Sequence, residues 1–358
     1  MTDPLLRFTD QQILDFRPPK NILDPNRPYG FLFEPECMVD GHVEDVATIF
    51  LTNRECPYRC LMCDLWRNTI DTVLPIGAIP QQIDFALGQL PPAKHLKLYN
   101  SGNFFDRKAI PPEDYPDIAS RARKFRSVTI ENHPKFCGLE SVRFRDLLNT
   151  ELTIAIGLET VNEGVLRGLN KCMTLGDFEK AVSFLLRHGI GVRSFILLRP
   201  PFMREAEGVD WAIRSLSYAF SVGVECCSVI PTRSGNGVLE RLQASRDFEP
   251  PTLLSMETVL EAGLKMKNGR VFMDLWNIEE FYKCNDCGSK RKDRMNKMNL
   301  SQIIKTLVSE IKLTETQAKI FLHIVIHGKM NTSKISSDLN ISLDDATQNS
   351  KKLVELGG

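Results

Sequence analysis

The stretch Cys56-Pro57-Tyr58-Arg59-Cys60-Leu61-Met62-Cys63 decides what we expect of this chain. Its three cysteines are spaced so that one short loop can wrap a corner of a cubic 4Fe–4S cluster. Three thiolates would hold three irons and leave the fourth iron without a protein ligand. The alternatives are ordinary buried thiols or part of a zinc site. A structural zinc usually takes four ligands from two pairs, and no second pair lies close to Cys63.

The segment before this loop, Val46 to Thr52, is a run of strand-forming residues. An iron without a protein ligand can be chelated by the amine and carboxylate of S-adenosylmethionine (SAM). The cysteine spacing and its place after a strand resemble the radical SAM superfamily. That resemblance implies a 4Fe–4S cluster and SAM as cofactors. It also implies a one-electron donor such as ferredoxin or flavodoxin.

Length and composition limit the class of protein to which this chain can belong. A chain of 358 residues with 42% hydrophobic residues is long enough for one large α/β domain and a small appendage. The formal net charge is zero, so no overall charge points to nucleic acid, although local patches remain open. No run of 18 apolar residues and no signal-peptide pattern occurs. For that reason we expect no membrane association. Because the ten cysteines are unevenly spaced, we expect a reducing, cytoplasmic environment.

Strand-like and helix-like segments alternate from Val46 to about Arg270, which predicts a parallel sheet with helical crossovers. Six such units favour a partial (β/α)6 barrel rather than a closed barrel of eight. The expected strands are 46–52, 95–100, 127–131, 152–158, 192–198 and 224–230, and the expected helices are 82–90, 116–125, 143–148, 175–187, 208–220 and 256–264.

We divide the chain into four parts. Residues 1–44 are rich in proline and read as an extended arm that packs over the outside or the mouth of the main domain. Residues 45–280 form the barrel, and residues 281–299 contain a CxxC pair beside a basic run. Residues 300–358 are expected to form a small helical unit.

Chemistry in such barrels lies at the carboxyl ends of the strands. Ser101-Gly102-Asn103 follows the second expected strand, where glycine allows a close backbone approach and asparagine offers a carbonyl oxygen. Glu131 and Glu159 end the third and fourth strands, and we assign all of these residues to the cofactor pocket. A plain turn and a solvated loop carboxylate are the alternatives for these positions.

Arg199 ends the fifth expected strand. Its guanidinium would suit the carboxylate of SAM or a substrate phosphate. An edge salt bridge is the alternative. The loop Pro231 to Gly237 follows the sixth strand, and its small polar residues are typical of an anion-binding loop.

Several of these motifs together resemble one group of radical SAM enzymes, the radical SAM subunit of archaeosine synthase, related to the elongator catalytic subunit. The resemblance spans roughly residues 45–290. It implies action on a 7-deazaguanine of tRNA that carries a lysine adduct, with C–N cleavage that leaves an amidine, and a partner transferase that installs the lysine. The motifs are Ser101 to Asp106, Ile156 to Thr160, Asn170-Lys171 with Thr174, Leu197 to Phe202 with Glu205 and Glu207, and Phe248 with Pro250-Pro251.

Cys284 and Cys287 form a CxxC pair followed by the basic run Ser289 to Arg294. One pair needs two further ligands to make a second metal site for zinc or another cluster. Ordinary thiols are the alternative. The basic run would suit phosphates, and a solvated surface loop is the more common explanation.

The sequence of the last part, residues 300–358, predicts three short helices: 315–327, 332–339 and 343–356. Each is preceded by a residue suited to an N-cap, namely Thr314, Asn331 and Ser342. They resemble the start of a winged helix-turn-helix. The third helix begins with Asp344 and Asp345, which oppose contact with DNA phosphates. We therefore favour a packing or interaction role.

The sequence thus predicts a radical SAM enzyme that modifies a base in tRNA. One alternative is a radical SAM enzyme that acts on a small metabolite. Another is a metal-sensing transcription regulator, in which the cysteines bind metal and the last helices bind DNA.

Overall fold

The computed structural model describes residues 8–304, 314–327 and 330–355. By its internal contacts the chain divides into two compact units, Met1–Ile303 and Ile304–Gly358. We describe each unit by itself.

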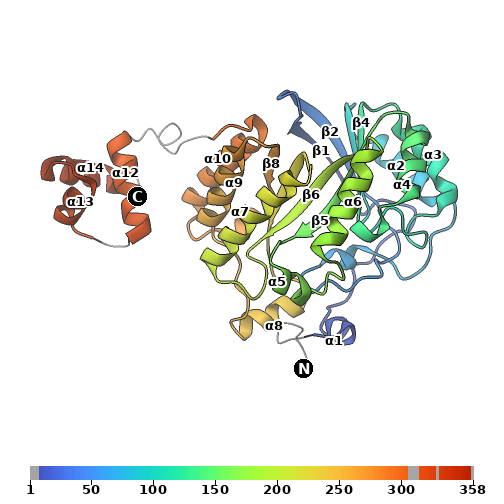
Figure 1. Cartoon of the computed structure of the whole chain (residues 1–358), viewed down its shortest axis with the longest axis horizontal. Coiled ribbons are helices and arrows are strands. Elements are labelled where there is room, and N and C mark those ends of the chain that lie inside the picture. The colour runs from blue at the N-terminus through green and yellow to red at the C-terminus, as the bar shows by residue number, and fades with distance from the viewer. Residues whose placement is uncertain (1–7, 305–313, 328–329, 356–358) are drawn as a thin grey trace. The chain divides into compact units, whose positions relative to one another are not determined.

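The first unit is built on one eight-stranded sheet whose strands lie in chain order (Figure 1). The first two strands are antiparallel, and every later neighbouring pair is parallel. The predicted α/β fold with a partial, curled barrel is confirmed, and all six expected strands are present. The strands are β1 (Gly30–Cys37), β2 (Val43–Phe50), β3 (His95–Tyr99), β4 (Ser127–Asn132), β5 (Glu151–Glu159), β6 (Gly191–Leu198), β7 (Cys226–Pro231) and β8 (Arg270–Met273).

Strands β1 and β8 were not expected. β8 comes from the apolar patch after residue 270 and extends the parallel part of the sheet by one strand. β1 lies within the proline-rich segment that we expected to be an arm over the domain. Pro35 is compatible with this strand because β1 is an edge strand, where a missing backbone N–H interrupts no ladder on its free side.

Helices connect the parallel strands and pack along the sheet (Figure 1). The expected helices are all found, one with the predicted ends (175–187) and the others with shifted ends. Short helices α1, α5 and α8 were not expected. The helices of this unit are α1 (Asp10–Asp15), α2 (Ala78–Leu87), α3 (Tyr115–Ala122), α4 (Leu139–Leu148), α5 (Glu163–Gly168), α6 (Leu175–Arg187), α7 (Glu205–Ser221), α8 (Val238–Ala244), α9 (Leu253–Met266) and α10 (Asn285–Ser301).

The sheet curls so that side chains of distant strands meet inside it. Tyr99 on β3 contacts Phe195 on β6, with ring centroids 6.2 Å apart. Glu36 on β1 accepts hydrogen bonds from the Arg193 guanidinium of β6 at 2.9 and 3.1 Å. Lys97 on β3 also pairs with Glu36. These contacts join strands that are not neighbours in the sheet, so they cross the interior of the half-barrel.

For the basic run after the CxxC pair, the sequence favours a solvated loop. In the structure this run is part of the 17-residue helix α10. Arg294 is buried, and its guanidinium pairs with Glu257 on α9 at 3.0 Å and with Glu261. Arg291 also pairs with Glu257, at 3.0 Å. The weakly apolar sequence hid this helix, because charged side chains make much of its contact with the sheet-covering helices.

The second unit contains α12 (Glu315–His327), α13 (Thr332–Leu339) and α14 (Leu343–Glu355). The expected N-caps are confirmed, since the side chains of Thr314, Asn331 and Ser342 accept hydrogen bonds from backbone N–H groups three residues later. The predicted last residue of the third helix, Leu356, lies outside the described residues. The small core of this second unit is formed by Ile320, Ile335, Ala346 and Leu353. Among the described helices, none has the length and apolar character needed to cross a bilayer.

Glu36 makes the stability of the first unit sensitive to acid. Burial opposes ionisation of its carboxyl, but Arg193 and Lys97 outweigh that effect and hold the pKa of Glu36 well below its ordinary value of 4.5. A carboxyl whose pKa is lowered by folding stabilises the protein above its unfolded pKa, and this contribution is lost as the pH falls below that value.

We therefore expect the free energy of unfolding to fall steadily below about pH 4.5, and to fall less in Glu36→Gln. Urea unfolding at pH 7, 4 and 3 measures this. Glu34→Gln is a matched control because Glu34 lies on the same strand but is 41% exposed in its side chain and 3.7 Å from Lys97. Equal acid dependence in Glu36→Gln and the parent would contradict this account.

Candidate active site

The three cysteines lie in an irregular loop that follows β2, at the carboxyl end of the parallel strands. Cys56, Cys60 and Cys63 are each half-buried. The loop has one tight turn, in which the Cys63 N–H donates to the Cys60 carbonyl at 3.1 Å. All ten cysteines fall within the described residues, and none is in a disulfide.

Segments that follow other strands fix the shape of this loop. After β5, the Leu169 carbonyl accepts from the Leu61 N–H at 2.8 Å. The amide of the next residue, Asn170, donates to the Arg59 carbonyl at 2.9 Å. These bonds satisfy backbone groups of the loop, which forms no helix or ladder of its own around the cysteines.

Asn236, which follows β7, contributes most to this fixation. Its side-chain nitrogen donates to the Leu61 carbonyl at 2.7 Å and to the Cys63 carbonyl at 3.3 Å. Its side-chain oxygen accepts from the N–H groups of Val238 and Leu239 at the start of α8. Asn236 is 3% exposed. We expected an anion-binding loop here. The structure instead uses this asparagine to hold the cysteine loop.

The electrostatics of the loop favour neutral thiols while no metal is bound. Burial raises the pKa of Cys60 to about 12, although the Lys171 ammonium acts in the opposite direction. Burial and the neighbouring Cys60 raise the pKa of Cys63. Burial also raises the pKa of Cys56, opposed by hydrogen bonds to its sulfur. Iron must therefore displace the thiol protons, as in other metal sites built on cysteine.

These residues fit a 4Fe–4S cluster. They are three free thiols on one loop, and the buried Lys171 ammonium next to them suits the negative charge of a thiolate-bound cluster. In the described parts of the chain no three His, Cys, Asp or Glu side chains converge as a single metal ion would require. A cubic cluster does not need such convergence, because each thiolate binds a different iron.

The turn Ser101-Gly102-Asn103 lies directly against the cysteine loop. Asn103 donates its amide N–H to the Cys56 sulfur at 3.2 Å and accepts the His133 N–H at 2.7 Å. A side chain at Gly102 would meet the Cys56 Cβ at 3.5 Å, so this position leaves room beside the first cysteine. Ser101 has a φ of 53° and its hydroxyl bonds to the Tyr29 hydroxyl at 2.8 Å.

Glu131, at the end of β4, holds the same turn from behind. Its Oε1 accepts the Asn100 N–H at 2.6 Å and the Gly102 N–H at 3.4 Å. Burial nevertheless raises the pKa of Glu131 to about 7, because the backbone donors only partly offset desolvation. Glu131 therefore shapes the turn, and its contact with a cofactor stays a prediction.

His133 and Tyr58 join the cysteine loop to the next segment. Their rings lie 4.2 Å apart between centroids. The imidazole accepts the Lys135 N–H at Nδ1 and donates from Nε2 to the Lys171 carbonyl at 2.9 Å, which fixes its neutral tautomer. Burial, with the positive charge of Lys171, lowers the pKa of His133 to about 4. No sequence pattern around His133 indicates these contacts.

Glu159 and Lys171 form a buried pair beside the cysteines, with 2.6 Å between Oε1 and Nζ. Glu159 has a φ of 65° and lies at a bulge in the β5–β6 pairing. A Cβ at Gly157 would come within 2.1 Å of the Glu159 carboxylate, so only glycine leaves space for this pair. Glu159 therefore forms an ion pair with Lys171. The positive charge of Lys171 in turn acts to lower the pKa of Cys60.

Arg199 is separate from this group. Its guanidinium donates to Glu205 at 2.6 Å, to Glu249 at 2.7 Å and to the Pro250 carbonyl at 2.8 Å. The structure therefore favours the salt-bridge alternative for Arg199 over a cofactor or phosphate contact.

Cys284 and Cys287 lie at the start of α10 and are both exposed. Hydrogen bonds from Cys287 lower the pKa of Cys284, and the thiol of Cys284 raises the pKa of Cys287. Among the described residues, no further ligand joins the pair to complete a second metal site.

Aromatic rings line the interior of the half-barrel near the pocket. Phe50, Tyr99 and Phe195 keep partial exposure, whereas their strand neighbours Ile49, Leu98 and Ile196 are fully buried on the opposite face. Phe50 also contacts Trp276 at 5.6 Å, and Trp276 is 54% exposed. The inner face of the sheet thus carries partly exposed aromatic rings beside the buried ion pairs of Glu36 with Lys97 and Arg193.

No family model matches the chain. It is similar to an uncharacterized protein of Methanocaldococcus jannaschii, with 24% identity over 80% of this chain and 85% of that protein. It is also similar to archaeosine synthase subunit beta of Thermococcus kodakarensis, with 29% identity over 50% of this chain and 57% of the relative. For the same subunit of Methanosarcina acetivorans the identity is 28%, over 62% and 68%.

Similar solved structures include methylornithine synthase, with a TM-score of 0.49 and 13% identity over 75% of this chain and 76% of that one. Coproporphyrinogen III oxidase of Escherichia coli, described as a radical SAM enzyme, has a TM-score of 0.40 and 11% identity over 73% and 56%. Archaeal Elp3 of Methanocaldococcus infernus has a TM-score of 0.46 and 13% identity over 61% and 59%. The resemblance noted from the sequence is confirmed, at this modest level of identity, by the two relatives named archaeosine synthase subunit beta.

Asn236 offers a test of how the cysteine loop is held. In Asn236→Ala the loop loses two hydrogen bonds, and the first two N–H groups of α8 lose their side-chain acceptor, a loss that typically costs about 1 kcal/mol for a side chain at a helix start. We expect a lower thermal midpoint and less iron per protein after anaerobic reconstitution. Ser234→Ala is a matched control, because Ser234 is in the same loop and bonds only to the side chain of Gln243. Parent-like iron retention in Asn236→Ala would contradict this role.

Proposed function

We propose that this chain is a cytoplasmic radical SAM enzyme in which Cys56, Cys60 and Cys63 hold a 4Fe–4S cluster. The observation that carries the proposal is the loop of three free thiols after β2 of a parallel half-barrel, fixed by buried side chains from other strand ends. When bound and reduced, the cluster and SAM supply a 5′-deoxyadenosyl radical that abstracts hydrogen from a substrate.

Different residues of the chain would position SAM and stabilise the cluster. The turn at Ser101 to Asn103, with Glu131 behind it, would position the amino acid end of SAM next to Cys56. The Lys171–Glu159 pair would place a positive charge against the thiolates and stabilise the bound cluster. The hydrogen bond from Asn103 to the Cys56 sulfur acts in the same direction.

For the substrate we propose a base in tRNA, a 7-deazaguanine carrying a lysine adduct, on which C–N cleavage would leave an amidine. Two features support this choice. The relatives named archaeosine synthase subunit beta act as part of a synthase with more than one subunit. The half-exposed rings of Phe50, Tyr99, Phe195 and Trp276 could stack on a planar base, a contact worth about 1–3 kcal/mol per base.

The same proposal includes a partner transferase that installs the lysine and an electron donor such as ferredoxin or flavodoxin. A small metabolite is the alternative substrate. A DNA-binding regulator is less well supported, because Asp344 and Asp345 stand at the start of α14 and would face phosphates in a helix-turn-helix complex.

Mass spectrometry of nucleosides from total tRNA tests the substrate. In a deletion strain we expect one modified nucleoside to disappear and a heavier, lysine-bearing precursor to accumulate. Cys60→Ala should fail to restore the nucleoside, because the cluster would lose a ligand. Cys37→Ala should restore it, since Cys37 is a buried thiol on β1.

An unchanged nucleoside profile in the deletion strain would contradict a tRNA substrate and favour the small metabolite. Restoration by Cys60→Ala would contradict the assignment of the cluster ligands.

A further inference from the structure

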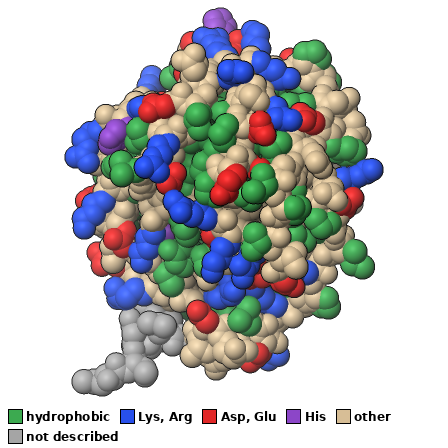
Figure 2. Space-filling model, turned by 90° about the vertical axis from the view of Figure 1, so that its right-hand side faces the viewer, with side chains coloured by type: hydrophobic (Ala, Val, Ile, Leu, Met, Phe, Trp, Pro, Cys, Tyr) green, Lys and Arg blue, Asp and Glu red, His purple; other side chains and the backbone are tan. Residues whose placement is uncertain are grey.

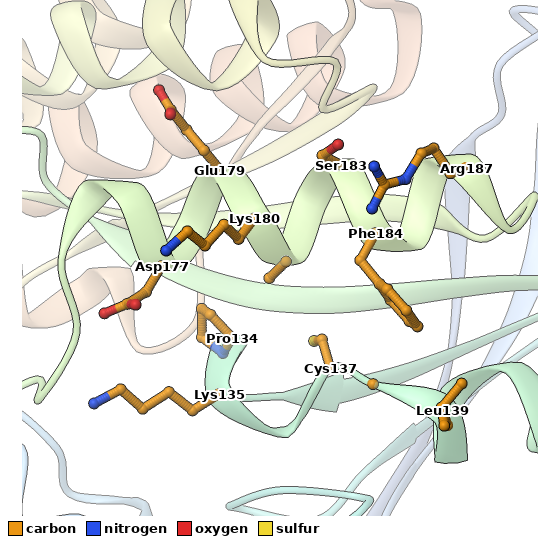
Figure 3. Close-up of a pocket in the computed structure, with 12 residues that line it drawn as sticks. Pro134, Lys135, Cys137, Leu139, Asp177, Glu179, Lys180, Ser183, Phe184 and Arg187 are labelled. Carbon is orange, nitrogen blue, oxygen red and sulfur yellow. The ribbon is translucent and has the colours of Figure 1, made fainter.

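A surface groove of about 700 Å³ lies between α6 and the segment that follows β4. One wall is the short 3₁₀ helix η3 (Pro134–Phe136) with the start of α4, and the other is one face of α6. Figure 3 shows side chains of both walls facing this space. None of the functional assignments above uses this groove.

Three cations border the groove: Lys135, Lys180 and Arg187. All three side chains are exposed, and no ion pair to a carboxylate is found for any of them within the described residues. Figure 3 shows Lys135 and Lys180 on opposite walls near the first turns of α6, with the Asp177 carboxylate between them, and Arg187 at the last turn. The three cations thus border the groove from η3 to the last turn of α6.

The two acids at the groove are bound to other groups. The Asp177 carboxylate accepts the Thr174 N–H at 2.9 Å in the capping box of α6. That bond, with Lys135 and Lys180 nearby, lowers the pKa of Asp177. Glu179 accepts the Tyr218 hydroxyl at 2.9 Å, and Figure 3 shows its side chain on the side of α6 away from Pro134 and Lys135. The groove therefore keeps a net positive charge, increased by the N-terminal end of the α6 dipole.

The groove begins beside the cysteine loop. His133, whose ring lies against Tyr58 of that loop, immediately precedes Pro134 of the groove wall. The Phe136 ring also contacts Tyr58, with centroids 6.1 Å apart. A polymer lying in the groove would thus reach the mouth of the half-barrel next to the proposed cluster.

The dimensions suit a nucleic acid strand. Lys180 and Arg187 are seven residues apart on α6, which corresponds to about 10 Å along the helix. Stacked nucleotides rise by about 3.4 Å each, so this distance covers about three phosphates. Phe184, half-buried in the same groove, offers a ring of the kind on which bases of single strands stack.

Overall charge does not account for binding of a polyanion by this chain. Figure 2 shows one face of the molecule on which basic and acidic side chains are interspersed. The formal net charge of the chain is zero. Binding of a polyanion therefore has to depend on a local arrangement of unpaired cations rather than on overall charge. The basic run on α10 is less suitable, since Arg291, Lys292 and Arg294 are in ion pairs.

We propose that the groove between η3 and α6 binds the phosphate backbone of the RNA substrate through Lys135, Lys180 and Arg187. It thereby guides a single-stranded segment to the mouth of the half-barrel. This inference rests on the tRNA substrate proposed above. It adds the surface that receives the strand outside the base-binding interior.

The test is binding of fluorescently labelled total tRNA to the reconstituted full chain, measured by anisotropy over a series of salt concentrations. The variant is K135Q/K180Q/R187Q. The charge-matched control is K124Q/K265Q/K267Q, which changes three exposed lysines outside the groove. Iron content and melting temperature of each protein establish that the fold and the cluster are retained.

We expect the groove variant to bind tRNA roughly tenfold or more weakly, and the slope of log affinity against log salt to decrease by about 2, for three lost phosphate contacts. The control should match the parent. Equal affinity and slope in the groove variant and the parent would overturn the groove while leaving the tRNA substrate intact. A parent that binds no tRNA would overturn both, and equal weakening in the two variants would mean non-specific attraction only.

Discussion

The structure depends on holding an irregular loop of three thiols in one shape. The loop forms no helix or ladder around its cysteines, so its backbone groups need partners from elsewhere. Asn170, which follows β5 and α5, and Asn236, which follows β7, supply them, while Asn103, which follows β3, donates to the Cys56 sulfur. The parallel sheet matters for this reason, because it brings these strand ends to the same edge. The carboxylate of Glu131 then supports the turn that contains Asn103.

The charges around the cysteine loop would suit a negatively charged occupant. Without metal, burial keeps the thiols protonated, and the Lys171 ammonium remains next to them. Removing protons from three thiols would place several negative charges in a half-buried region, which Lys171 and the Asn103 amide would offset. Glu159 in turn keeps Lys171 charged within the protein, and Gly157 leaves the space that this pair occupies. The cysteine loop and its surroundings are thus matched electrostatically.

Much of the fold could be predicted because its inner strands are continuous apolar runs. The parts that escaped prediction have specific causes. β1 was hidden by prolines, and α10 by a charged sequence whose buried Arg294 pairs with residues far away in the chain. The site, too, could be predicted only in part. The cysteine spacing identified the loop, whereas Arg199 could be placed only once its contacts with Glu205 and Glu249 were known. No local pattern distinguishes an arginine that binds ligand from one that binds two carboxylates.

The most direct test of the account is the formation of 5′-deoxyadenosine from SAM by the anaerobically reconstituted, chemically reduced protein, quantified by liquid chromatography with mass spectrometry. The account predicts that protein loaded with four irons per chain releases 5′-deoxyadenosine, at a rate that rises when total tRNA from a deletion strain is added. Fully loaded protein that forms none, with or without this tRNA, would contradict the assignment of the cysteine loop as a radical SAM site.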